Sequence, residues 1–412
     1  MVSGIFLSLS LRLQTIINDK ESRALFTILV INVISALLCL FFVTLGRKDM
    51  ADSDFIAYIF FCGMFGLSNY LFFGMQEYIY KIKRNGQNIF PLDYGKFFGA
   101  LSLLSWVGIY ISSKIIYSNE LIVQTLDLFV LLFPLHAISI LFRTVFEFNF
   151  KREMSALFKG FNIVAIYSRP FFNSTDMWIL VTIAVFSFTS VALGLRALKF
   201  LTFKASSENI SIKSILTSGF NVNFVWGYSQ LIPLIEKAFF VFFLPLTVSA
   251  PLLFLSEIFQ RGAIIYGMIG NFYFPRLAEL VEEKITFNKY ILRQYYIFVS
   301  FVILAVLSFI FVALIMPSVV TYFGGSELNP LLIGVFFTQF VCMGSFSLLV
   351  RPLYLLNKIN LVAGLLFISM TMYCVIFFVV GESLTGLLAA LTVHVFLDVL
   401  MAICILKYKE VT

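Results

Sequence analysis

The chain has 412 residues, of which 60% are hydrophobic and 12% charged, and its mean hydropathy is +0.98. Soluble domains are about 45 to 50% apolar and about 25% charged, so this composition excludes a soluble protein. The net charge of +7 fits the basic cytoplasmic loops of a multi-span membrane protein better than binding to nucleic acid.

Twelve apolar stretches along the chain are long enough to cross a bilayer, since one spanning helix needs roughly 20 residues. Residues 1–23 precede them and are expected to form a helix at the membrane surface rather than a cleaved signal peptide. The predicted spans are 24–46, 55–80, 93–113, 121–142, 154–174, 177–198, 214–236, 250–274, 291–316, 328–350, 357–380 and 383–406. These spans leave no room for a folded aqueous domain, and no GxxxxGK phosphate loop occurs.

The fifth stretch, 154–174, is the least apolar because Lys159 and Arg169 lie near its ends. The distribution of basic residues supports it, since Lys and Arg concentrate in cytoplasmic loops. With both termini cytoplasmic, 23 of the 29 Lys and Arg fall inside, five fall outside, and Arg261 lies within a span. Without the fifth span the division becomes 13 inside and 15 outside. The bias therefore predicts that this span exists.

The polar segment 199–213 divides the predicted spans into two sets of six. We expect an N-lobe at 24–198, a cytoplasmic linker at 199–213, a C-lobe at 214–406 and a short tail at 407–412. Both lobes start from the cytoplasmic side, as two parallel repeats would. The predicted fold class is an all-α polytopic membrane protein with about 12 transmembrane helices in a 6+6 arrangement.

Several ionisable residues fall within these spans, where their cost makes them functional candidates. Glu257 and Arg261 stand four apart in the eighth span and share one helix face. They are either a self-neutralising structural pair or part of an aqueous cavity, in which the planar Arg261 guanidinium suits phosphate. Glu77 and Arg351 lie near inner span ends, where each either acts on a substrate or has a structural role, Glu77 by extending toward its neighbouring lysines and Arg351 toward the headgroups.

Two more pairs of ionisable residues are candidates. His394 and Asp398 stand four apart in the twelfth span, as a proton or sodium site or as a hydrogen-bonded packing pair. Glu236 and Lys237 close the predicted seventh span, where we expect a solvated pair, or contact of Lys237 with anionic headgroups. The five cysteines lie singly in apolar runs, so neither a metal site nor a disulfide framework is predicted, and no cofactor is expected.

Three stretches resemble the polysaccharide-export flippases. They are LGRKDMADSDFIAYIFFCGMFGLSNYLFFGMQEYIYKIKR at 45–84, YFPRLAEL at 273–280 and IMPSVVTYFGGSELNP at 315–330. Their order and spacing carry the resemblance, which covers residues 22–406. The chain is thus similar to the Wzx-type O-antigen and polysaccharide flippases of the multidrug/oligosaccharidyl-lipid/polysaccharide superfamily.

The resemblance implies a protein of the bacterial inner membrane that moves an undecaprenyl-diphosphate-linked oligosaccharide from the cytoplasmic to the periplasmic leaflet. It implies alternating access driven by an ion gradient, and a polysaccharide polymerase and a chain-length regulator as partners. The substrate-binding candidates are Arg261, Glu257, Glu77, Arg351 and Lys237. For coupling to the ion the candidates are Glu77 and the His394/Asp398 pair. No catalytic residue is expected.

Two alternatives stay open. An O-antigen polymerase is a membrane glycosyltransferase with a similar number of spans, but it needs a large outer loop, and the predicted outer loops are short. A drug or metabolite antiporter of the same superfamily is the other alternative. Such antiporters usually carry fewer aromatic residues in the early spans, whereas 17% of this chain is aromatic.

Overall fold

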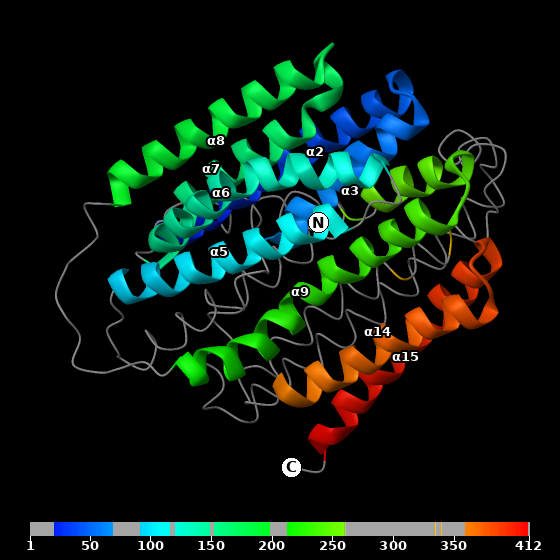
Figure 1. Ribbon diagram of the computed structural model, residues 1–412. Helices are drawn as coiled ribbons and strands as arrows, with labels where there is room; N and C mark the ends of the chain where they lie inside the picture. The colour runs from blue at the N-terminus through cyan, green and yellow to red at the C-terminus, as the bar shows by residue number, and fades with distance from the viewer. Residues whose placement is uncertain are drawn as a thin grey trace, which may run out of the picture.

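The computed structural model describes residues 20–68, 91–115, 120–148, 152–197, 212–258 and 359–410, together with residues 260, 334 and 339. Within these ranges the chain forms helices joined by short turns, so the all-α fold is confirmed. The long helices run roughly side by side as a bundle (Figure 1). The predicted surface helix at 1–23 and the spans at 291–316 and 328–350 lie outside the described residues, save residues 20–23, 334 and 339.

The N-terminal helices follow the apolar stretches closely. The six are α2 (Lys20–Asp49), α3 (Asp52–Ser68), α5 (Pro91–Ile115), α6 (Glu120–Phe148), α7 (Arg152–Tyr167) and α8 (Thr175–Ala197). Helices are the expected structure here because a bilayer leaves backbone groups no other partner. For the span predicted at 55–80, the structure describes only the part within α3.

The later helices are α9 (Ile212–Phe243), the Leu246–Ile258 helix, α14 (Ile359–Val380) and α15 (Leu384–Glu410). Helix α9 packs against α14, which packs along α15. In the described part of the chain, four helices are long and apolar enough by composition to cross a membrane, within α2, α6, α8 and α14. By length and composition, these helices suit a multi-pass membrane protein.

The fifth helix is confirmed, but it is shorter than predicted. Helix α7 ends at Tyr167, and a 3-10 turn follows at Arg169–Phe171. Pro170 accounts for this, because proline disfavours the α conformation at the residue before it. The carbonyl of Ala165, near the end of α7, accepts a hydrogen bond from the indole of Trp178 at 3.1 Å.

Four connections lie at the same end of the bundle (Figure 1). They join α2 to α3, α7 to α8, α9 to the Leu246–Ile258 helix, and α14 to α15. Gly381 makes the last turn with a φ of +123°, which favours glycine. The charge distribution predicts that this end faces outward, so we refer to it as the outer end.

The N-terminal helices form one group and the later helices form another. The two groups meet where α3 packs against α9. A continuous apolar core runs through this contact, and it includes Phe55 and Phe61 of α3 and Phe240 of α9. By contrast, long apolar side chains such as Phe41 of α2 and Phe188 of α8 are exposed. A face of this kind suits contact with lipid. Polar side chains buried where α3 meets α9 are therefore unusual in this apolar protein, and we call this contact the seam.

Candidate functional site

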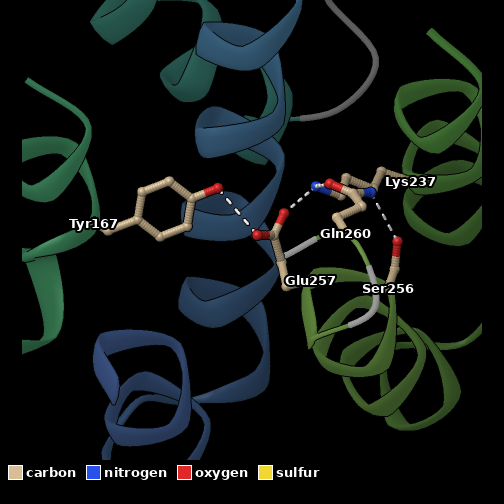
Figure 2. Close-up of polar contacts among 5 residues, drawn as sticks. All are labelled: Tyr167, Lys237, Ser256, Glu257 and Gln260. Carbon is tan, nitrogen blue, oxygen red and sulfur yellow. Dashed lines mark hydrogen bonds and ion pairs between the residues drawn. The ribbon is translucent and has the colours of Figure 1, made fainter. Parts of the chain in front are cut away.

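An ion pair between Lys237 and Glu257 lies at the centre of the candidate site (Figure 2). Lys237 comes from α9, and Glu257 comes from the Leu246–Ile258 helix that follows it. Their side chains are 1% and 0% exposed. Charges are tolerated at such burial only when they are paired and hydrogen-bonded, and the pair meets this requirement.

Neighbouring polar side chains form further hydrogen bonds to the pair. The hydroxyl of Tyr167 donates to Glu257 Oε2 at 3.0 Å, while Lys237 donates to Glu257 Oε1. Lys237 Nζ also donates to Gln260 Oε1 at 3.2 Å, and the Gln260 amide donates to Ser256 Oγ at 3.1 Å. Figure 2 shows Tyr167 reaching the carboxylate from the side opposite Lys237. Both carboxylate oxygens are therefore occupied.

Helix α3 forms another wall of the site. A methyl group at Gly63 would lie 3.2 Å from Lys237 Cδ and 3.3 Å from its Nζ, so the absent side chain leaves room for Lys237. Tyr58 donates to the backbone oxygen of Tyr167 at 2.7 Å, and the two rings meet edge-to-face at 6.1 Å. We name the five polar side chains of Tyr167, Lys237, Ser256, Glu257 and Gln260 the seam cluster.

The environment predicted for Glu236 and Lys237 was wrong. Both side chains are buried rather than solvated, because α9 does not end at residue 236 but continues to Phe243. The apolar run AFFVFF after Lys237 was the signal for the longer helix. Contact of Lys237 with lipid headgroups is not seen, since its ammonium is taken by Glu257 and Gln260.

Glu236 belongs to a different contact. The side-chain amide of Gln339 donates to Glu236 Oε1, and both residues are buried. Successive residues of a helix point about 100° apart, which separates Glu236 from Lys237 around α9. Sequence reasoning missed Gln339, a neutral residue without a distinguishing pattern.

His394 of α15 is fully buried, and its Nε2 lies 2.6 Å from the hydroxyl of Tyr228 on α9. Tyr373 of α14 contacts the same imidazole edge-to-face, with 5.5 Å between ring centroids. Asp398 lies one turn further along α15, but its side chain is outside the described part of the structure. The predicted His394/Asp398 contact therefore stays a prediction, and the contact with Tyr228 is additional.

The other candidates, Glu77, Arg261 and Arg351, lie outside the described residues. The structure thus does not test whether Glu257 also meets Arg261, which follows it by four residues. It does show that Glu257 has Lys237 as a partner from a different helix. Chemically, the cluster offers an ammonium that can bind an anion and a carboxylate that can bind a cation or a proton, each currently satisfied by the other.

A separate polar network lies among the N-terminal helices. Asn162 of α7 donates to Ser139 Oγ of α6 at 2.7 Å and accepts from Thr189 Oγ1 of α8 at 2.9 Å. All three residues are buried. Such side-chain hydrogen bonds hold membrane helices together, so this network has a structural role.

The chain matches no protein-family model and no curated protein by sequence. Solved structures do match it along nearly its whole length. A mutant of the Vibrio cholerae MATE transporter VcmN is 12% identical, with a TM-score of 0.56, over 94% of this chain and 96% of that one. A multidrug resistance MATE family transporter of the MOP superfamily, in an inward-facing conformation, is 14% identical, with a TM-score of 0.57, over 94% of this chain and 99% of that one. This chain therefore has the fold of the MATE transporters.

Proposed function

We propose that the protein is a membrane exporter that moves an undecaprenyl-diphosphate-linked oligosaccharide from the cytoplasmic to the periplasmic leaflet of the bacterial inner membrane. The observation that carries the transport function is the near full-length match to transporter folds. The substrate class rests on the sequence stretches 45–84, 273–280 and 315–330, which resemble polysaccharide flippases.

The physical requirement for such a carrier is shielding of the sugar. Each hydroxyl that loses water without gaining a partner costs several kcal/mol in hydrocarbon. A polar path between two lobes shields the headgroup, while the lipid tail stays in the bilayer. Movement of the two lobes then exposes the path to each side in turn.

Within this mechanism, Arg261 is proposed to bind the diphosphate, because a guanidinium pairs with two phosphate oxygens at once. Glu257 is proposed to orient Arg261, and Lys237 supplies a second cation to the same region. Glu77 and Arg351 are further substrate contacts. The coupling ion is assigned to Glu77 or the His394/Asp398 pair.

A small-molecule antiporter is the second candidate, because the structural neighbours include a multidrug resistance transporter. Transport assays on purified protein in vesicles separate the two, with a lipid-linked oligosaccharide in one set and small organic cations in the other. The polymerase alternative receives no comparable support, since both neighbours named above are transporters.

Gene deletion in the host tests the proposal. We expect loss of surface polysaccharide, with single lipid-linked repeat units retained on the cytoplasmic side of the inner membrane. Repeat units accumulating on the periplasmic side would instead indicate a polymerase. Unchanged polysaccharide would refute export of this substrate and favour the antiporter.

Complementation then tests the assigned residue. Arg261→Ala is expected to abolish export at a normal membrane level of the protein. The matched control is Arg196→Ala, which removes an exposed arginine at the end of α8 and is expected to leave export intact. Normal export by Arg261→Ala would remove that residue from the mechanism.

A further inference from the structure

We propose that Tyr167, Lys237 and Glu257 form a gate that closes the outer end of the transport path. Opening toward the outside then requires Tyr167 to leave Glu257. The inference rests on the proposed transport function, because only a protein that alternates between two open states needs such a gate.

The cluster lies in the outer half of the bundle. Tyr167 is the last residue of α7, at the outer end. Lys237 precedes the end of α9 at Phe243 by six residues, which places it about 9 Å from that end at 1.5 Å per residue. Glu257 follows the start of its helix at Leu246 by eleven residues, or about 16 Å.

Among the described residues, the contacts in this region that join an N-terminal helix to a later one include the following three. Tyr167 of α7 donates to Glu257 at 3.0 Å. Gly63 of α3 lies against the Lys237 side chain. Phe55 of α3 and Phe254 of the Leu246–Ile258 helix pack with 6.5 Å between their ring centroids. Hydrogen bonding and apolar packing thus close the two groups against each other here.

The position of the ion pair allows the two groups of helices to separate without breaking it. Lys237 and Glu257 both belong to the later helices, so moving these helices away from α3 and α7 leaves the pair intact. The hydrogen bond from Tyr167 then breaks, together with the contacts of Gly63 with Lys237 and of Phe55 with Phe254. An ion pair divided between the two groups would instead leave an isolated charge on each side, at a much higher cost.

Labelling of a cysteine placed within the cluster measures the opening. Ser256 is 3% exposed, so Ser256→Cys, in a chain whose native cysteines are replaced by serine or alanine, is protected while the gate is closed. A membrane-impermeant maleimide added to spheroplasts reacts at a rate that follows the fraction of outward-open protein. Tyr167→Phe removes a hydrogen bond to a charged group, so we expect the labelling rate to rise on the order of tenfold.

A second variant, at Gly63, leaves the hydroxyl of Tyr167 in place. Gly63→Val places a branched side chain against Lys237 and pushes α3 from α9, so it is also expected to raise the rate. The matched control is Thr189→Val, which removes a buried hydroxyl from the network inside the N-terminal helices. This control is expected to leave the rate unchanged.

The outcomes separate the gate from the transport function. Unchanged labelling in both Tyr167→Phe and Gly63→Val would overturn the gate. An equal rise in Thr189→Val would also overturn it, because general loosening would then explain the result. A rise confined to the two gate variants supports the gate even where gene deletion leaves surface polysaccharide unchanged, a result that refutes only the proposed substrate.

Discussion

Removing one member of the Lys237–Glu257 pair is expected to destabilise the protein far more than removing both charges. In Lys237→Met, the Glu257 carboxylate loses the Lys237 ammonium and keeps the hydroxyl of Tyr167 at 3.0 Å. In Glu257→Gln, the ammonium loses this carboxylate and keeps its hydrogen bond to Gln260 Oε1 at 3.2 Å. Two unit charges 4 Å apart attract by about 4 kcal/mol at an effective dielectric constant of 20.

The burial of both side chains sets the size of the effect. Because they are 1% and 0% exposed, water cannot replace the lost partner. Breaking a buried pair by removing one member typically costs roughly 3–5 kcal/mol, whereas replacing both members is often close to neutral. We therefore expect each single variant to be strongly destabilised and the double variant Lys237→Met/Glu257→Gln to recover most of the loss.

The original protein, the two single variants and the double variant are purified in detergent and heated to a series of temperatures. Size-exclusion chromatography then measures how much of each protein remains folded. The midpoint temperature should fall in both single variants and return toward the original value in the double variant. If the two losses simply add in the double variant, the residues do not interact. A single variant as stable as the original protein would refute burial of an ion pair at this site.

Three further predictions use the same measurement. Asn162→Ala removes two buried hydrogen bonds, so a loss of about 1–3 kcal/mol is expected, and an unchanged midpoint would contradict the network. Gly160→Val is expected to separate α2 from α7, because a Cβ there would lie 2.6 Å from Ser35 Oγ; Ser35→Gly should restore part of the loss, and no rescue would refute this contact. Phe239→Ala removes a ring stacked on Phe377 at 4.2 Å, with an expected cost of about 3–5 kcal/mol, whereas Phe242→Ala, at a ring 43% exposed, should cost much less; equal losses would contradict the packing.

Hydropathy and charge predicted most of the described helices. The helix α7 shows why, since its apolar character is weak and the distribution of Lys and Arg nevertheless required it. Both signals come from the membrane itself, which demands long apolar helices and basic inner loops. They act along the sequence, so a single chain reveals them.

The contacts of the candidate site were not predictable in the same way. A spacing of four residues predicts contact of Glu257 with Arg261, whereas the observed partners Lys237 and Tyr167 lie 20 and 90 residues away. Contacts of this kind depend on how helices pack, which periodicity does not specify. Two neutral groups, Tyr167 and Gln339, carry no charge that would distinguish them in an apolar sequence.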